Sequence, residues 1–388
     1  RTPKNALFMC FGSGVTAGTL GLSDFERIDA VEISRDVLDA APLFAADNLG
    51  VLENPKMNFV VDDGRNFLLT TENQYGLITF EPMPLAVAGV STFYTQEFYE
   101  QCLAHLAPGG LVSQWVPLHS LDIDVVRSLV FTFRSVFPEY CMWFINADLF
   151  LVGSNQPLRI DYGNAARTYG NPEIGPRLQA AGIGDLTELL SCFFMGKDSM
   201  AAFSEGGSLM LDDRPWAEFV APKLMFDSTV DKSLETLKPF YASPLEMLVF
   251  PEIPEAVVES ARAALALRHE AHKVTLDGEV LLYRGLIGES QEEKFMAALD
   301  IDPRDYTARF YLKDIAVQRM ALFIRWNELD NARAYLAKVR PYLGDDPAYA
   351  LMEGDVLFAE KKHEDAAHAY RRYLDLGGTE ARAHERAG

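Results

Sequence analysis

The chain has 388 residues, of which 49% are hydrophobic and 23% are charged, an ordinary globular balance with room for two or three domains. The net charge of −21 disfavours nucleic acids and anionic membrane surfaces as partners, because binding their phosphates needs a basic face. No uninterrupted apolar run of about 18 residues occurs, so no segment of this sequence is predicted to span a bilayer.

Strand-like and helix-like segments alternate through the first part of the chain. Strands are predicted at residues 5–11, 27–33, 57–61, 75–80 and 111–116, with a closing pair of strands at 140–152. Helices are predicted from residue 15 and over 36–49, 95–106 and 123–137, the third of them stopped by Pro108-Gly109-Gly110. This alternation predicts an α/β fold with a mostly parallel, doubly wound, Rossmann-like sheet.

The rest of the chain is predicted to be mainly helical. Short helical pieces over 157–225 complete a first domain, residues 1–225. Residues 226–250 are predicted to be a linker or docking segment, and residues 251–388 an all-α domain. The protein should therefore consist of a sheet domain followed by a helical one.

Two helical segments near the end of the sequence repeat at a fixed interval. Ala332 and Ala366 are 34 positions apart, and so are Leu336 and Tyr370. A period of 34 is that of tetratricopeptide-like helical hairpins, so a tetratricopeptide-like repeat domain is predicted. A plain helical bundle with a chance period is the alternative.

Cysteine and histidine spacing gives no sign of a metal site. The four cysteines lie far apart in apolar stretches without a C-x-x-C pair, a pattern typical of buried thiols in a reducing compartment. His269 and His272 form H-E-A-H, one residue short of the H-E-x-x-H zinc motif. We therefore predict that the protein uses no metal.

Residues suited to binding a nucleotide fall at the ends of four predicted strands. They are Gly12 and Gly14, Glu32, Asp63 and Glu81. In doubly wound sheets ligands bind at the carboxyl ends of the strands, so these residues are expected to surround one cleft. The glycines would let the backbone approach a ligand, although a purely structural turn would look the same.

Two of the carboxylates match parts of a nucleotide. Glu32 lies about 20 residues past the glycines, where a carboxylate can accept both hydroxyls of a ribose; the alternative is a solvated acid at a strand end. Asp63 could accept from an adenine amine, with Gly64 keeping the ring slot open, and Asp62 is the competitor for that role.

Glu81 is the candidate catalytic residue. Pro82 and Pro84 follow it and stiffen the loop that would hold the carboxylate in the cleft. Such a carboxylate can bind a cationic amine and take up its proton during attack on carbon, or it only orients a neighbouring loop. Gln114 and Trp115, at the end of the fifth strand, could line an amine pocket, in which the face of Trp115 would hold an alkylammonium by cation–π attraction; core packing is the alternative for Trp115.

Together these motifs resemble the spermidine/spermine synthase family of polyamine aminopropyltransferases over about residues 5–225. The resemblance is carried by Phe8–Gly21, Val31–Ile33, Val61–Arg65, Tyr75–Trp115 and Asp212–Phe219. It is closest to the branch often fused to membrane segments, in which the fourth strand typically ends in Glu-Pro, here Glu81-Pro82, before an Ala-Gly-Val segment.

The resemblance implies an S-adenosylmethionine-dependent transferase fold and an aminopropyl transfer from decarboxylated S-adenosylmethionine to a small amine, as in polyamine biosynthesis. By motif match, the nucleotide site would contain Gly12, Gly14, Glu32 at the ribose, and Asp63 with Gly64 at the adenine. Glu81 takes the position of the family's catalytic aspartate. A cationic substrate also suits the acidic chain, because an acidic surface raises the local concentration of cations.

Departures from the family pattern leave alternatives open. Typical members carry a second acid three residues after the catalytic one, whereas this loop is Glu81-Pro82-Met83-Pro84. The glycine loop also lacks the family's acidic residue, and the family's N-terminal β-hairpin domain does not occur in this sequence. One alternative is another transferase that uses S-adenosylmethionine, such as a methyltransferase. The other is a non-catalytic subunit that its helical repeats dock onto a larger assembly.

The helical repeats, the first residue and the supply of the nucleotide bear on further partners and on the location. A protein bound by the helical repeats and a second copy of the chain in a homodimer both stay open as partners. The first residue is Arg1 rather than Met, so we expect a piece of a longer or processed protein, with membrane segments upstream left open. Supply of the nucleotide predicts a cytoplasmic location, either free or as the soluble part of a membrane-anchored protein.

Overall fold

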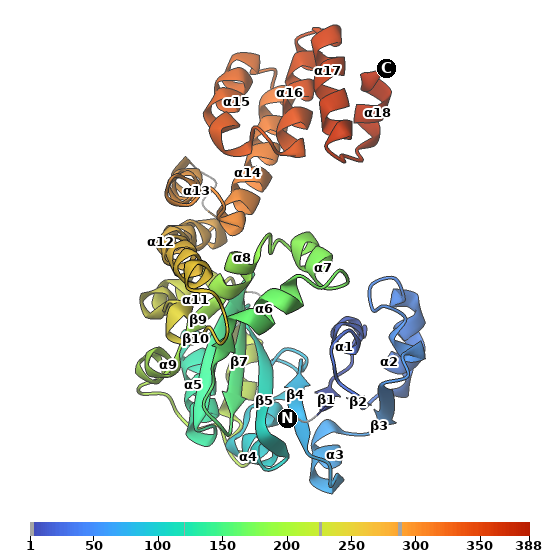
Figure 1. The fold of residues 1–388 in the computed structure, drawn as a ribbon, viewed down its shortest axis with the longest axis vertical. Coiled ribbons are helices and arrows are strands. Elements are labelled where there is room, and N and C mark those ends of the chain that lie inside the picture. Colours follow the sequence, from blue (N-terminus) through green and yellow to red (C-terminus); the bar gives the residue numbers. More distant parts are fainter. Residues whose placement is uncertain (1–3, 120, 225–226, 286–288) are drawn as a thin grey trace. The chain divides into compact units, whose positions relative to one another are not determined.

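The computed structural model of the chain describes residues 4–119, 121–224, 227–285 and 289–388 (Figure 1). Arg1–Pro3 and Phe226, the first residue of the predicted linker, lie outside the described residues. Two compact units are distinguished: Arg1–Ala181 with Asp185–Ala266, and Gly182–Gly184 with Leu267–Gly388. The predicted domain limits at residues 225 and 250 stay predictions, because a division by contacts does not test which pieces fold on their own.

The first unit is built on an eight-stranded sheet with the order β3-β2-β1-β4-β5-β7-β6-β9 (Figure 1). Its strands are β1 (Asn5–Met9), β2 (Arg27–Glu32), β3 (Met57–Val61), β4 (Tyr75–Phe80), β5 (Leu106–Pro117), β6 (Glu139–Ile145), β7 (Asp148–Ser154) and β9 (Phe193–Met195). The first five strands of this order are parallel, and β7, β6 and β9 are antiparallel to their neighbours. The predicted doubly wound α/β sheet is confirmed, and its strand order reverses between β1 and β4.

Helices join the parallel strands and bury apolar residues against the sheet. They are α1 (Val15–Gly21), α2 (Arg35–Ala40), α3 (Gly64–Thr70), α4 (Gln96–Ala104) and, from β5 to β6, α5 (Ile123–Val136). One apolar cluster contains Phe8, Phe11, Ala17, Ala30, Leu38, Ala41 and Val51. A second group consists of the aromatic rings of Phe80, Phe98, Tyr99, Phe133 and Phe137. These contacts hold the carboxyl ends of β1, β2 and β4 in fixed positions.

The helix predicted over 36–49 is shorter in the structure. α2 ends at Ala40, and the 3₁₀ turn η1 (Ala41–Phe44) follows because Pro42 has no N–H to continue the α-helical bonding. Leu49 and Gly50 then take positive φ values of 63° and 61° before η2 (Val51–Glu53) leads into β3. The periodic pattern predicted the helix but not its early end.

The strand predicted at 111–116 begins earlier than expected. α4 ends at Ala104, and Pro108-Gly109-Gly110, predicted to stop that helix, lie inside β5. Gly109 has a φ of 75°, and its N–H donates to Asn155 Oδ1 at 3.0 Å. The register between β4 and β5 shifts at this end, so a local irregularity accommodates the glycines within the strand.

β6 and β7 form the predicted closing pair of strands. Asn146 and Ala147 join them with positive φ values of 51° and 66°, as a two-residue hairpin turn of type I′ requires. Asp148 then begins β7 opposite Pro117 of β5, and the Leu118 N–H donates to the Ala147 carbonyl at 3.1 Å. The hairpin therefore carries Asp148 to the carboxyl end of β5.

Short elements complete the first unit. They are β8 (Ile160–Asp161), α6 (Tyr162–Tyr169), α7 (Gly175–Ala180), α8 (Leu186–Ser191), α9 (Lys197–Phe203), α10 (Trp216–Val220) and η4 (Ala221–Leu224). The predicted linker contains α11 (Val230–Leu237), η5 (Lys238–Phe240), η6 (Pro244–Glu246) and β10 (Leu248–Val249), which pairs with β8. Val230, Leu234 and Leu237 are buried, so this segment contributes to the core of the unit.

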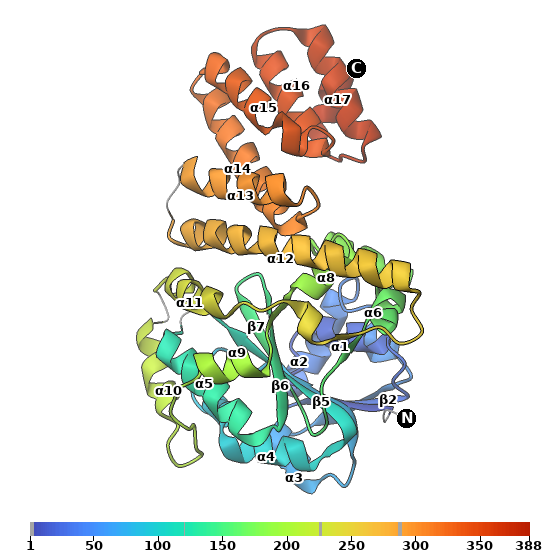
Figure 2. The same cartoon turned by 60° about the vertical axis from the view of Figure 1, so that its left-hand side comes forward.

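The C-terminal region is all-helical, as predicted (Figure 2). Its helices are α12 (Glu255–Tyr283), α13 (Glu289–Ile301), α14 (Tyr306–Arg325), α15 (Leu329–Leu343), α16 (Pro347–Ala359), α17 (His363–Asp375) and α18 (Ala381–Ala387). Within the described ranges of the chain, no helix combines the length and the apolar composition needed to cross a bilayer.

The 34-residue interval places matching residues at matching positions of two helices. Ala332 is the fourth residue of α15 and Ala366 the fourth of α17, and both are buried. Leu336 and Tyr370, one helical turn further on, are buried as well. The spacing therefore reflects equivalent packing of α15 and α17, while a tetratricopeptide array stays a proposal.

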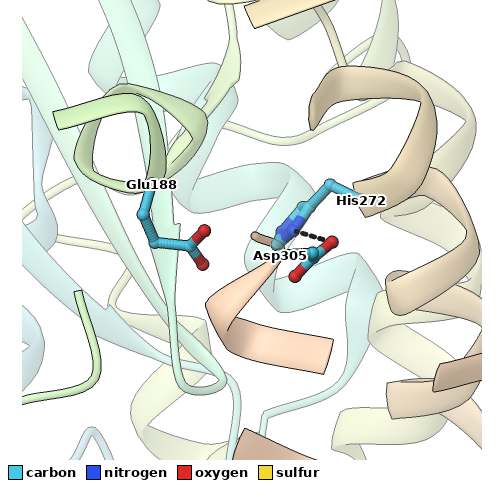
Figure 3. A group of neighbouring side chains, drawn as sticks. All are labelled: Glu188, His272 and Asp305. Carbon is cyan, nitrogen blue, oxygen red and sulfur yellow. Dashed lines mark ion pairs between the residues drawn. The ribbon is translucent and has the colours of Figure 1, made fainter. Parts of the chain in front are cut away.

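Buried ion pairs hold the loop between α13 and α14 against α12 in the second unit. Arg268 has no exposed surface, donates to Asp302 Oδ2 at 2.8 Å and also binds the Arg304 carbonyl. His272, from the H-E-A-H motif, has its Nδ1 3.8 Å from Asp305 Oδ2 (Figure 3). Charges are tolerated in such interiors only when they are paired, so the loop depends on these partners.

Replacing Arg268 by alanine is expected to lower the free energy of unfolding by about 3–5 kcal/mol, because Asp302 then stays buried without its partner. Denaturant unfolding followed by circular dichroism measures the loss. Arg304→Ala is the matched control, since this side chain also faces Asp302, at 3.9 Å, but is 59% exposed. We expect it to cost less than about 1 kcal/mol, and equal losses in the two variants would contradict the burial argument.

Candidate functional site

A cavity of about 470 Å³ lies at the carboxyl ends of β1, β2, β3 and β4, where the strand order reverses. This is the usual position of a ligand in a doubly wound sheet, and the volume is that of a small-molecule site. Three carboxylates line the cavity, those of Glu32, Asp63 and Glu81. Gly12 and Gly64 line it as well, and apolar residues of segment 82–93 form one wall.

Glu32 ends β2 and is held by backbone groups on both sides. Its Oε2 accepts from the Phe11 N–H at 2.9 Å, and its Oε1 accepts from the Ser34 N–H at 3.0 Å. The residue is only 7% exposed, so the carboxylate has a single well-defined orientation. Each carboxylate oxygen can accept a second hydrogen bond, which leaves acceptor capacity for a ligand in the cavity.

Asp63 is the N-cap of α3. Its Oδ1 accepts from the N–H groups of Arg65 and Asn66 at 2.9 and 3.0 Å, which satisfies free donors of the first helical turn. Asp62, the competing residue, is not part of the cavity lining, and its Oδ1 accepts from the Asp63 N–H at 2.8 Å. The structure therefore brings Asp63 to the cavity and uses Asp62 to shape the turn before it.

The glycines serve different purposes. Gly12 has a φ of 56° and lines the cavity, and a Cβ added to it would have no other atom within 4 Å. Gly14, with a φ of 82°, is the N-cap of α1 and lies outside the lining, and a Cβ added to it would lie 2.5 Å from Phe11 Cζ. At Gly64 an added Cβ would lie 3.0 Å from Met9 Sδ, so this glycine also permits close packing of α3 on β1.

Glu81 follows β4 directly and is half-buried. The Thr16 hydroxyl, from α1, lies 3.0 and 3.1 Å from its two carboxylate oxygens and donates to them. Burial raises the pKa of the Glu81 carboxyl above its ordinary value, and the negative charge of Asp148 adds to the rise, whereas the hydrogen bond from Thr16 opposes it. A carboxylate with a raised pKa is a better proton acceptor than an ordinary one.

Gln114 and Trp115 lie at the predicted strand end but outside the cavity lining. Gln114 has no exposed surface, accepts from the Tyr99 hydroxyl and donates to the Phe93 carbonyl at 3.3 Å. Since Phe93 lines the cavity, Gln114 supports its wall from behind. Trp115 is half-buried and donates a hydrogen bond to Asp148, the residue that begins β7.

Acidic residues distant in the sequence hold the wall formed by η3 (Val90–Tyr94). Both oxygens of Asp212 accept from Arg65, each at 2.8 Å, and Asp212 Oδ1 also accepts from the Thr95 hydroxyl at 2.7 Å. The hydrogen bond from Arg65 holds the pKa of Asp212 below its ordinary value. Glu218 accepts from the Ser91 hydroxyl at 2.5 Å. The family resemblance marked this segment, but the sequence did not reveal its bracing role.

The cavity is negatively charged. None of the described residues that line it is a lysine or an arginine. Cys10, also in the lining, has its thiol pKa raised to about 12 by burial and by the charges of Glu32, Asp63 and Glu81. The thiol therefore stays protonated, and the site is electrostatically suited to a cation.

Comparison with known proteins places the likeness in this part of the chain. Residues 8–147 match a family model described as spermine/spermidine synthase domain. The polyamine aminopropyltransferase of Nitrosomonas europaea is 30% identical over 137 residues, 35% of this chain and 42% of the relative. That of Clostridium botulinum is 33% identical over 110 residues, 28% of this chain and 38% of the relative. The chain thus spans less than half the length of these curated relatives.

A solved structure, a probable spermidine synthase from Corynebacterium glutamicum, is 18% identical, with 54% of this chain and 73% of that chain covered and a TM-score of 0.40. The matched residues 8–147 include every residue that lines the cavity. The family that the comparisons support for this part of the chain is therefore that of the spermine/spermidine synthase domain.

Proposed function

We propose that the protein is a transferase that moves an aminopropyl group from decarboxylated S-adenosylmethionine to a small amine, as in polyamine biosynthesis. The observation that carries this proposal is the convergence of Glu32, Asp63 and Glu81 on one cavity whose described lining contains no lysine or arginine. The donor's reacting group is a sulfonium cation, and the acceptor is an amine that is protonated in neutral water. Carboxylates attract both.

In the proposed nucleotide site Glu32 accepts from the two ribose hydroxyls. Its fixed orientation between the Phe11 and Ser34 N–H groups supports this role, because little entropy is lost when the ligand binds. Asp63 accepts from the exocyclic amine of adenine through Oδ2, since capping of α3 uses Oδ1. Gly12 leaves room for the ligand, and the apolar wall contacts the adenine faces.

The charge of the cavity favours the decarboxylated nucleotide over S-adenosylmethionine itself. The methionine carboxylate would lie near three acids, and the described lining offers it no cationic side chain. Of the two enzyme functions, that of a methyltransferase that uses S-adenosylmethionine is therefore the less supported.

Glu81 is proposed to be the general base. The ammonium group of the acceptor first loses a proton, which frees the lone pair of its nitrogen. This nitrogen then forms a bond to the methylene carbon next to the sulfonium, the carbon–sulfur bond breaks with its electron pair going to sulfur, and 5′-methylthioadenosine leaves. The proton lost by the nitrogen goes to a Glu81 oxygen, whose raised pKa suits it to this task. Because the sulfonium is already a good leaving group, positioning and electrostatics supply much of the remaining rate enhancement.

The pH dependence of the transfer should report on Glu81. We expect kcat to fall as the pH drops through the pKa of Glu81, because the protonated carboxyl cannot accept the proton. The Thr16 hydroxyl lowers this pKa, so Thr16→Val should raise it and move the acidic limb of the kcat profile to higher pH. If the acidic limb stays in place or moves to lower pH, the titration of a group other than Glu81 causes it.

Binding of three nucleotides tests the proposed function first. Calorimetry with 5′-methylthioadenosine, S-adenosylmethionine and its decarboxylated form should give the tightest binding for the decarboxylated form. A preference for the carboxylated form would favour a methyltransferase. No binding of any of the three would exclude both enzyme readings.

A non-catalytic subunit is the second candidate function. The loop Pro82-Met83-Pro84 after Glu81 carries no second acid, which favours a subunit that has lost catalytic activity. The 34-residue spacing of α15 and α17 favours a tetratricopeptide-like region, and such arrays present a groove to a peptide or protein. Membership of the membrane-fused branch, a cytoplasmic location and a homodimer are further proposals that rest on the family resemblance.

A further inference from the structure

A fourth carboxylate, that of Asp148, lies at the same edge of the sheet as the three that line the cavity. β7 is antiparallel to β5, so its first residue lies at the carboxyl ends of β4 and β5. Phe80, directly before Glu81, is opposite Gln114, and Asp148 is opposite Pro117, three residues further along β5. In sheet order the acids are therefore Asp63, Glu32, Glu81 and Asp148.

Asp148 lies on the side of Glu81 that faces away from the nucleotide cavity. The cavity lining comes from the ends of β1 to β4 and from segment 82–93, and Asp148 is not part of it. One strand, β5, separates β4 from β7, so the two backbones are roughly 10 Å apart. Trp115 lies on that strand and donates its hydrogen bond to Asp148.

Asp148 and Glu81 have no lysine or arginine as an ion-pair partner in the described part of the chain. His119 is the basic group whose charge acts on Asp148. Burial raises the pKa of Asp148, the hydrogen bond from Trp115 opposes this, and its negative charge in turn raises the pKa of Glu81. Two neighbouring carboxylates without a lysine or arginine partner favour the binding of a cation between or beside them.

We propose that Asp148 is the second acid of the amine site. It binds the non-reacting ammonium group of the acceptor, at the far end from the nitrogen that attacks. This inference rests on the proposed function. The reacting amine lies at Glu81, the carbon chain of the acceptor lies along the half-buried Trp115, and the distal ammonium pairs with Asp148. The acid that the loop Pro82-Met83-Pro84 lacks is thus supplied by the β6–β7 hairpin.

Asp148→Asn tests this role with diaminobutane and butylamine as acceptors, because only the diamine has a distal ammonium. Asparagine keeps an oxygen that can accept from Trp115 but removes the charge. We expect the KM for diaminobutane to rise by about 10- to 100-fold at a pH above the acidic limb, while kcat changes little. The preference for diaminobutane over butylamine in kcat/KM should shrink by the same factor.

Two further measurements separate binding of the amine from a structural role. The affinity for 5′-methylthioadenosine should not change, and the acidic limb of kcat should move to lower pH, since loss of the Asp148 charge lowers the pKa of Glu81. Thr16 and Cys10 face Glu81 as well and are unchanged in this variant. Asp148→Glu, which keeps the charge, should restore part of the diamine preference.

Asp24→Asn is the matched control, because it removes one charge at an exposed position outside the cavity lining. It should leave both acceptors unaffected, which separates a local contact from the overall charge of −21. An unchanged diamine preference in Asp148→Asn, or a weakened affinity for 5′-methylthioadenosine, would overturn the assignment of Asp148 while the proposed function stands. Absence of transfer to any amine by the unmodified protein would overturn both.

Discussion

Glu81→Gln is expected to lower kcat of aminopropyl transfer by about 100- to 10,000-fold, the usual contribution of a positioned general base. The amide cannot take up the proton that the attacking amine loses. It retains an oxygen that can accept from the Thr16 hydroxyl, so the local structure should persist. The affinity for 5′-methylthioadenosine should stay within about threefold, because this product is uncharged and needs no proton acceptor.

Single-turnover rates with saturating nucleotide measure the chemical step without product release. Glu72→Gln, the same change at an exposed position outside the cavity lining, is the matched control and should behave as the unmodified protein. If Glu81→Gln keeps more than about a tenth of the rate, Glu81 only orients the neighbouring loop. If the unmodified protein binds the nucleotide but transfers nothing, the non-catalytic subunit becomes the better interpretation.

Glu32→Ala is expected to weaken binding of 5′-methylthioadenosine by about 100- to 1,000-fold. Two hydroxyl hydrogen bonds to a carboxylate are lost, each worth about 1.5–3 kcal/mol before non-additivity. Removal of the carboxylate also leaves the N–H groups of Phe11 and Ser34 without their acceptor. Part of any loss could therefore come from a disturbed turn rather than from the ribose.

Free adenine separates these two causes, because it lacks the ribose that Glu32 is proposed to hold. Its affinity, measured by competition, should fall by less than about threefold in Glu32→Ala if the cavity keeps its shape. An equal loss for adenine and 5′-methylthioadenosine would show that Glu32 acts through the backbone of the turn. The thermal midpoint of the variant, measured alongside, reports how much stability the two N–H groups lose.

The acids of the candidate site could be found in the sequence because each lies at the end of a strand. Glu32, Asp63 and Glu81 follow short apolar runs, and parallel strands bring such positions to one edge. The spacing from the glycines to Glu32 added a second local signal. The structure places these three side chains around one cavity, while their roles toward a ligand stay proposals.

Other predicted site residues depended on the direction in which each residue faces, which local sequence patterns do not determine. Gly14 follows β1 and Gln114 lies within β5, but both lie outside the cavity lining, Gly14 as a helix N-cap and Gln114 as a buried support of Phe93. Successive residues at a strand end point in different directions, so a strand end alone does not show which one faces the ligand. α2 ends early, at Ala40, because Pro42 follows, and β5 includes Pro108-Gly109-Gly110, which the pattern predicted to stop a helix.

The sequence by itself determined how strands and helices follow one another along the chain, the acids at the strand ends and the helical character of the C-terminal region. These features depend on periodicity and on residues close together in the chain. Only the tertiary structure decided that the charge of Asp148 acts on Glu81 and that Asp212 and Glu218 brace the wall of the cavity. The physical reason is that these contacts depend on which strands become neighbours and on how a hairpin folds back, and burial of the whole sheet sets both.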